Sequence, residues 1–316
     1  MPSVAAAGRT PALWSVGLVG FLARGGFLLI LLPMLALPSP VSLSVLIGPD
    51  LVDANGLSAR VAALLVLAGG LVVLALVAGL VMAVLADIAA FEGILSATGV
   101  AVPSRARRPL ARLVVKLLAL QLAAAVPFLI ALVPTVAVMA GVIRQEILLP
   151  SDQGLPLWWR VVESTWPWLV VVAATVLLAS HIYSVVGREL LARHVGLLPP
   201  TPGSSALRRV LGAPAALLRR PGRAVAASVA VWAVGICGAV VAAALIALGW
   251  TIAQVAYLSP PTGATVLATV ATWMAAAAGT AVLVGLLGAA LVLLGATAAM
   301  RSALLTRAAV GGRGLA

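Results

Sequence analysis

The stretch that decides the fold runs from Val61 to Ala90, VAALLVLAGGLVVLALVAGLVMAVLADIAA, and holds a single charged residue, Asp87. The hydrocarbon core of a bilayer is about 30 Å thick, so a helix needs roughly 20 consecutive apolar residues to cross it. This stretch is long enough, and it predicts a transmembrane helix. Five other stretches share its character, which gives six expected spans, at about 11–37, 61–90, 112–143, 166–187, 224–250 and 265–299.

The composition of the whole chain agrees with this prediction. Of the 316 residues, 63% are hydrophobic and only 9% are charged, and the mean hydropathy is +1.21. Soluble globular domains carry about a quarter charged residues, so a soluble fold is excluded. We therefore expect an all-α polytopic transmembrane helix bundle that forms one integral membrane domain over residues 1–316. The first run continues to Leu37 without a cleavage pattern of signal-peptide length, and we expect it to be a retained span.

The basic residues indicate the orientation. Sixteen of the twenty Lys and Arg residues lie in segments that six spans would place on one face of the membrane, and three lie on the other. Positively charged loops are retained in the cytoplasm, so both termini are expected there. Aromatic side chains gather near the predicted outer interface, where amphipathic rings are favoured. These are Trp158, Trp159, Trp166, Trp168, Trp250 and Tyr257.

The net charge of +12 predicts a partner of opposite charge. The basic residues cluster at helix ends with few aromatic neighbours for base stacking, so nucleic acid is not expected as a partner. Anionic lipid on the cytoplasmic face is the simpler partner. Six arginines are expected to contact lipid headgroups: Arg107, Arg108, Arg208, Arg209, Arg219 and Arg220.

Three short basic-proline motifs indicate an internal repeat. Arg9-Thr10-Pro11, Arg107-Arg108-Pro109 and Arg219-Arg220-Pro221 open the first, third and fifth spans. Proline is tolerated in the first turn of a helix, where its missing N–H would have no partner. A charged residue closes each even span at a similar distance from these prolines: Asp87 after 76 residues, Arg188 after 79 and Arg301 after 80. This spacing predicts three tandem helical hairpins; ordinary helix-start chemistry is the alternative explanation.

The chain resembles uncharacterised six-span bacterial membrane proteins in three features. These are the number of spans, the Arg-Pro motifs that open the hairpins and the stretch Ala23-Arg24-Gly25-Gly26. These proteins are similar to the membrane domain fused to some glycerophosphodiester phosphodiesterases. The resemblance covers the whole chain and implies a membrane architecture. It implies no activity, because the phosphodiesterase domain is not part of this sequence.

Arg24 is the polar residue most indicative of a site within the membrane. It lies thirteen residues after Pro11, about 20 Å along a helix, which would place it near mid-bilayer. A charge there is costly and faces the bundle interior, a partner or water. The alternative is an interfacial helix over residues 11–23, with Arg24 at its end and Gly25-Gly26 opening a shorter span. The expected partner of Arg24 is Asp87, with Glu189 as second choice, in a structural ion pair.

Gln121 and His181 complete the intramembrane polar candidates. We expect His181 to be a hydrogen-bonded histidine and not a metal ligand, since no span supplies further ligands. Small residues recur at helical spacing in two spans, and they predict close helix packing. These are Ala277, Ala281, Gly285 and Ala289 in the last span, and Gly235 and Gly238 in the fifth.

No Walker-type loop, HExxH motif, nucleophile elbow or carboxylate cluster is found, and the chain has only eight acidic residues. We therefore expect a protein that is not an enzyme and that needs no metal or cofactor. The preference for Arg over Lys, with much Ala, Val, Leu and Gly, is typical of a GC-rich bacterial genome. The sequence favours an accessory or scaffold protein of a bacterial inner membrane. The alternative is a permease subunit driven by a separate ATPase, with a coupling surface on residues 91–108 or 196–222.

Overall fold

The computed structural model describes the chain in eight stretches, and everything below concerns these residues. They are 2–31, 52–53, 56–57, 59–100, 110–148, 157–198, 221–258 and 266–310.

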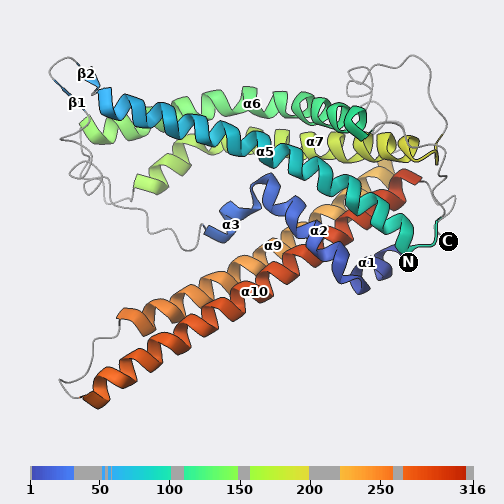
Figure 1. Ribbon diagram of the computed structural model, residues 1–316. Helices are drawn as coiled ribbons and strands as arrows, with labels where there is room; N and C mark the ends of the chain where they lie inside the picture. Colours follow the sequence, from blue (N-terminus) through green and yellow to red (C-terminus); the bar gives the residue numbers. More distant parts are fainter. Residues whose placement is uncertain are drawn as a thin grey trace.

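Five long helices dominate the structure (Figure 1). They are α5 (Ala59–Ala97), α6 (Leu110–Leu148), α7 (Leu157–His194), α9 (Pro221–Leu258) and α10 (Val266–Val310). Each contains a stretch long and apolar enough to cross a membrane. The only strands among the described residues are β1 (Val52–Asp53) and β2 (Gly56–Leu57), which pair antiparallel. The described structure is thus almost entirely helical, and five of the predicted spans correspond to continuous helices.

The N-terminal run differs from the prediction. The expected span over 11–37 is not one continuous helix between Pro11 and Leu31, and residues 32–37 lie outside the described residues. The chain forms four short segments: α1 (Pro2–Arg9), α2 (Pro11–Phe21), the wide π-type turn η1 (Leu22–Gly26) and α3 (Phe27–Leu31). The break falls at Gly25, whose φ of 89° lies in the left-handed region that glycine adopts without steric cost.

The basic-proline motifs coincide with helix starts. Pro11 and Pro221 are the first residues of α2 and α9, and α6 begins at Leu110, directly after Pro109. The prolines fit there because the first turn of a helix has no partner for their missing N–H groups.

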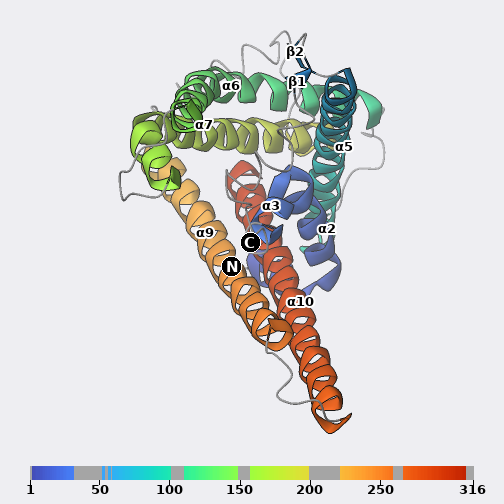
Figure 2. The same ribbon diagram turned by 90° about the vertical axis from the view of Figure 1, so that its left-hand side faces the viewer.

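The helices form two groups that meet at one end. α6 packs along α7, and α9 packs along α10; the α9–α10 hairpin diverges from α5, α6 and α7 (Figures 1 and 2). α2 lies between α5 and α10 and contacts both. The last turns of α10 reach back to α5 and α7, and Ala7 of α1 packs there against Ile94 and Ala303. The end at which α5, α7 and α10 finish is therefore the best-packed part of the molecule.

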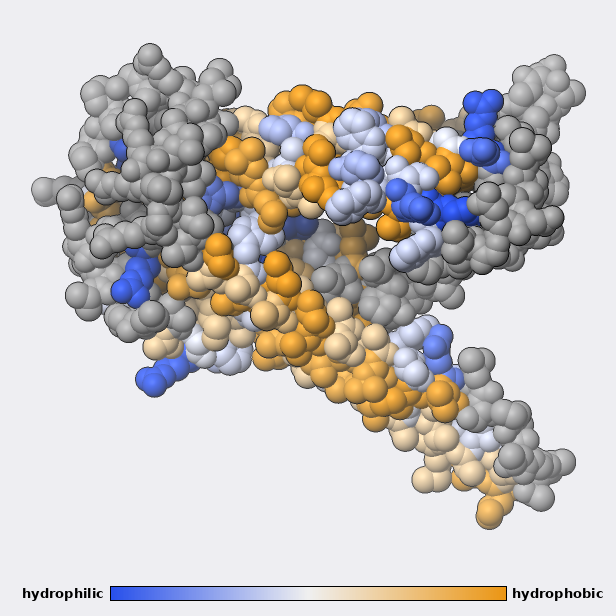
Figure 3. Space-filling model, turned by 180° about the vertical axis from the view of Figure 1, so that it is seen from behind, coloured by the Kyte–Doolittle hydropathy of each residue, from blue (hydrophilic) through white to orange (hydrophobic). Residues whose placement is uncertain are grey.

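Apolar side chains cover the outer surface of the long helices. Val66 on α5 is 76% exposed and Leu267 on α10 is 83% exposed, and both belong to long rows of exposed aliphatic residues. Figure 3 shows this apolar surface extending along the diverging α9–α10 hairpin. Exposing so much apolar surface to water is unfavourable, whereas the acyl chains of a bilayer are as apolar as these side chains.

Small residues bring the helices together, although not at all the predicted positions. The stripe Ala277, Ala281, Gly285 and Ala289 is exposed, so none of the described helices covers it. Close packing of this stripe, including self-association, stays a prediction. Gly235 and Gly238 do face α10: a Cβ on Gly238 would lie 2.6 Å from the Thr297 methyl group. Lipid and helix are equally apolar, so small size alone does not show which face is covered.

Candidate functional site

The best-packed end of the bundle contains an open-sided cavity of about 690 Å³. All five long helices contribute to its lining, as do α2, η1 and α3. Three of the lining residues are arginines, Arg24, Arg188 and Arg301, and one is an acid, Asp87. We call this space the arginine cavity. Its charged side chains carry an excess of two positive charges, because guanidinium groups stay protonated in proteins.

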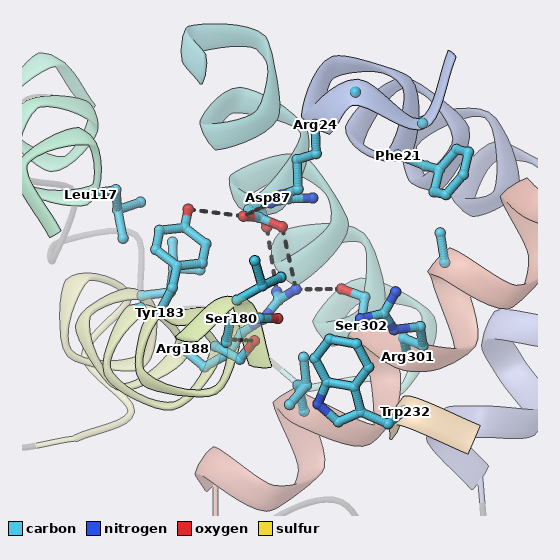
Figure 4. Close-up of a pocket in the computed structure, with 18 of the residues that line it drawn as sticks. Phe21, Arg24, Asp87, Leu117, Ser180, Tyr183, Arg188, Trp232, Arg301 and Ser302 are labelled. Atoms are coloured by element: carbon cyan, nitrogen blue, oxygen red, sulfur yellow. Dashed lines mark hydrogen bonds and ion pairs between the residues drawn. The ribbon is translucent and has the colours of Figure 1, made fainter. Parts of the chain in front are cut away.

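Asp87 lies at the centre of the polar groups (Figure 4). It is carried by α5 and pairs with Arg24 of η1 through Oδ2. The Tyr183 hydroxyl of α7 donates a second hydrogen bond to the same oxygen, at 2.9 Å. Arg188 approaches the other oxygen, with 3.7 Å between Nη2 and Oδ1. One carboxylate thus holds together three segments that are distant in the sequence.

Arg188 connects α7 to both α5 and α10. Its side chain is only 6% exposed, so its charge needs partners. Nη1 donates to the Asp87 backbone oxygen at 3.4 Å, and Nη2 donates to Oγ of Ser302 at 2.6 Å. Its guanidinium also lies 5.9 Å from the centroid of the Phe91 ring. These contacts fix the junction at which α5, α7 and α10 meet.

Arg24 is placed by the break in the N-terminal segment. Its Nη1 donates to the Gly20 carbonyl at 3.2 Å, and its guanidinium lies 5.9 Å from the centroid of the Tyr183 ring. The expected pairing with Asp87 is present. α2 begins at Pro11 and ends three residues before Arg24, as in the expected alternative of a helix over residues 11–23. That alternative placed the helix at the membrane interface, whereas α2 packs between α5 and α10. The left-handed backbone of Gly25 turns the chain directly after this arginine.

Gly25→Ala is expected to destabilise the protein by about 1–2 kcal/mol, because an L-residue is disfavoured at φ 89°. A Cβ there would meet nothing within 4 Å, so the cost comes from the backbone alone. The measurement is the apparent melting temperature of purified protein in detergent. Gly69→Ala in α5 is the control, since that position is also open and is helical. Equal melting temperatures for the two variants would contradict the expectation.

Arg301 differs from the other two arginines. It is carried by α10, and its guanidinium lies 5.7 Å from the Trp232 ring of α9. Within the described ranges its buried Nε has no hydrogen-bond partner and its side chain forms no ion pair. Figure 4 shows Arg301 beside Ser302 and Trp232. A guanidinium has five N–H donors, so Arg301 is the arginine of the cavity best able to bind an anion.

The other residues predicted from sequence lie elsewhere. Ser180 and Tyr183 line the cavity but His181, between them on α7, does not. Gln121 lies on α6 with a buried Oε1 that no described residue bonds. Glu189 pairs with Arg193 on its own helix and not with Arg24. The six arginines expected at lipid headgroups lie outside the described residues: Arg107, Arg108, Arg208, Arg209, Arg219 and Arg220.

Sequence reasoning did not place Arg188 and Arg301 in a site, although one signal pointed to them. The residues that close the even spans, Asp87, Arg188 and Arg301, stand at similar distances from their prolines. In the structure all three line the arginine cavity. Equal register along successive helices brings equivalent residues to one depth, and packing then brings them together.

The polar groups of the cavity are mostly hydrogen-bond donors. Oδ2 of Asp87 accepts from Arg24 and Tyr183, and Oδ1 lies 3.7 Å from Nη2 of Arg188, which leaves this acid poorly placed to act as a base. Among the described residues, no group of three or more His, Cys, Asp or Glu side chains could hold a metal ion. The hydroxyl and guanidinium donors favour an anionic group.

Comparison of the chain with protein-family models, with curated proteins and with solved structures finds no match. The class of the protein therefore rests on its own helices. Five helices of membrane-spanning length with apolar outer surfaces define a polytopic integral membrane protein.

Proposed function

We propose that the protein is a non-enzymatic accessory protein of a bacterial inner membrane that acts by binding an anionic group in the arginine cavity. The observation that carries this proposal is the imbalance of charge, with three guanidinium groups against one carboxylate. Arg24 and Arg188 share Asp87, whereas Arg301 has no ion-pair partner among the described residues. Arg301 is half-buried with a fully buried Nε, and an anionic ligand would compensate the desolvation of its charge.

Six crossings, with both termini in the cytoplasm, form part of this proposal. Ala7 packs against Ile94, close to the last residue of α5, whereas α5 starts at Ala59. A helix of 39 residues is about 58 Å long, and this separation between the two ends of α5 supports a further crossing between Ala7 and Ala59. The sorting of basic residues supports the cytoplasmic assignment of the packed end. The arrangement in three hairpins and the resemblance to six-span bacterial membrane proteins remain predictions.

The permease alternative also remains a prediction. It requires a coupling surface on residues 91–108 or 196–222, and residues 101–109 and 199–220 lie outside the described part of the chain. No described contact favours an ATPase partner over the binding role.

The binding role predicts that an anion stabilises the protein and that Arg301 mediates the effect. Purified protein in a zwitterionic detergent is heated with inorganic phosphate, glycerol 3-phosphate or dioctanoyl phosphatidylglycerol. An effective ligand at 100 times its Kd stabilises the folded state by about 2.7 kcal/mol. We expect Arg301→Gln to remove most of this stabilisation. Arg307→Gln is the control, because Arg307 is an exposed arginine on the same helix outside the cavity.

The proposal fails if none of the three probes raises the apparent melting temperature of the wild-type protein. It also fails if each probe stabilises Arg301→Gln as much as the wild type. Gel filtration of both variants checks that they remain monodisperse.

A further inference from the structure

The depth of the arginine cavity can be read from three helices. In each of three stretches a long uncharged run ends at a charged residue. Residues 61–86 are followed by Asp87, and residues 224–300 are followed by Arg301. Residues 164–187, in which His181 is the one titratable cation, are followed by Arg188. The first ionised side chain after a long uncharged run lies where hydrocarbon gives way to headgroups. All three residues line the cavity, which therefore lies at headgroup depth on the side where these helices end. Positive charge assigns that side to the cytoplasm.

The cavity also extends from this depth toward the membrane centre. Along α7 its lining runs from Arg188 back to Val176, twelve residues away, or about 18 Å of helix. Half of a hydrocarbon core is about 15 Å thick. Apolar side chains from several elements also line the cavity: Phe21, Leu28, Leu117 and Val176. The cavity is therefore cationic at headgroup depth. Toward the membrane centre the hydroxyls of Ser180, Tyr183 and Ser184 give way to Val176 along α7.

We infer that the ligand of the arginine cavity is an anionic glycerophospholipid of the inner leaflet, held by its phosphate at Arg301 and by an acyl chain along Val176. This inference rests on the proposed anion-binding function and specifies its ligand. A free phosphate would use only the cationic end, whereas a lipid matches both ends. Guanidinium groups bind phosphate oxygens through paired N–H donors. In Arg301 the Nε donor has no hydrogen-bond partner among the described residues.

The surroundings of Arg301 leave hydrogen-bond donors available for a phosphate group. The Trp232 ring holds the guanidinium by a cation–π contact, which leaves the N–H edge available. Ser302 is the next residue, and its Oγ already accepts from Arg188, so its hydroxyl proton can be donated to a ligand oxygen. Val176 and Leu28 are 40% and 59% exposed, so the apolar part of the cavity is accessible from the lipid.

The experiment measures the affinity of delipidated protein in detergent for four probes by native mass spectrometry and thermal shift. The probes are dioctanoyl phosphatidylglycerol, dioctanoyl phosphatidylcholine, glycerol 3-phosphate and inorganic phosphate. We expect the phosphatidylglycerol to bind most tightly, and Arg301→Gln to weaken it by about tenfold to a hundredfold. Arg307→Gln is expected to leave it unchanged.

A second pair of variants tests the acyl-chain end. Val176→Asn places an amide in the apolar part of the cavity and is expected to weaken phosphatidylglycerol binding by about tenfold. It should leave any binding of glycerol 3-phosphate unchanged. Val170→Asn is the matched control, because Val170 is exposed on the same helix and does not line the cavity.

The outcomes separate this inference from the proposed function. If glycerol 3-phosphate or inorganic phosphate binds as tightly as the lipid and Val176→Asn has no effect, the lipid inference is wrong and the anion-binding function stands. If phosphatidylcholine binds as well as phosphatidylglycerol, the inference is also wrong, because the site does not select charge. If no probe binds, both proposals fall.

Discussion

Asp87→Ala is expected to destabilise the folded protein by about 3–5 kcal/mol. The substitution removes the carboxylate that Arg24, Tyr183 and Arg188 share. Arg188 is the reason for the large effect, because its side chain is 6% exposed and would keep its charge without a counter-ion. The measurement is the apparent melting temperature and the monodisperse yield of purified protein in detergent.

Two comparisons show whether the effect comes from the ion pairs. Glu92→Ala removes an exposed acid from the same helix and should be nearly neutral. In the double variant Asp87→Leu/Arg188→Met both charges are replaced by apolar groups, and we expect it to recover part of the lost stability. If Asp87→Ala behaves like Glu92→Ala, Asp87 does not hold the three segments together.

Gly295→Leu is expected to separate α2 from α10 and to destabilise the protein by about 3 kcal/mol. The backbones of the two helices are in direct contact at this position. A Cβ on Gly295 would lie 2.6 Å from the Trp14 carbonyl oxygen, and one on Gly17 would lie 2.7 Å from the Gly295 carbonyl oxygen. The obstacle is backbone, which cannot rotate away as a side chain can. Since α2 leads directly into η1, its displacement should also remove Arg24 from Asp87.

The matched control for this variant is Gly288→Leu. Gly288 is on the same helix, and a Cβ there would meet nothing within 4 Å. We expect a melting temperature close to that of the wild type for Gly288→Leu and a clear loss for Gly295→Leu. The same pair should differ in anion-dependent stabilisation. Equal stability of the two variants would show that α2 and α10 do not cross as closely as the structure indicates.

Five of the six predicted spans were predictable because the bilayer sets a simple requirement. A helix that crosses about 30 Å of hydrocarbon must carry a long uncharged run, and the run at 61–86 and its counterparts are visible in the sequence. The prolines that open α2 and α9 were informative because their effect is local to the first helical turn. The pairing of Arg24 with Asp87 followed from the scarcity of acids, since the chain has only eight.

The helix–helix contacts were not predictable in the same way. In a lipid environment the face of a helix that meets lipid is as apolar as the face that meets another helix. The exposed stripe at Gly285 and the close crossing at Gly295 therefore look alike in the sequence, and only the structure separates them. The break at Gly25 was also not determined by its neighbours, because a glycine pair is compatible with a continuous helix as well as with a turn.

The sequence by itself determined the class of the protein, because that depends on the distribution of apolar and charged residues along single helices. It left open which charges meet. Only the tertiary structure brought Arg188 and Arg301 beside Arg24 and Asp87. It also placed apolar side chains from α2, α3, α6, α7, α9 and α10 around the same cavity. The physical reason is that a cavity is formed by residues far apart in the chain, and their approach depends on the packing of whole helices.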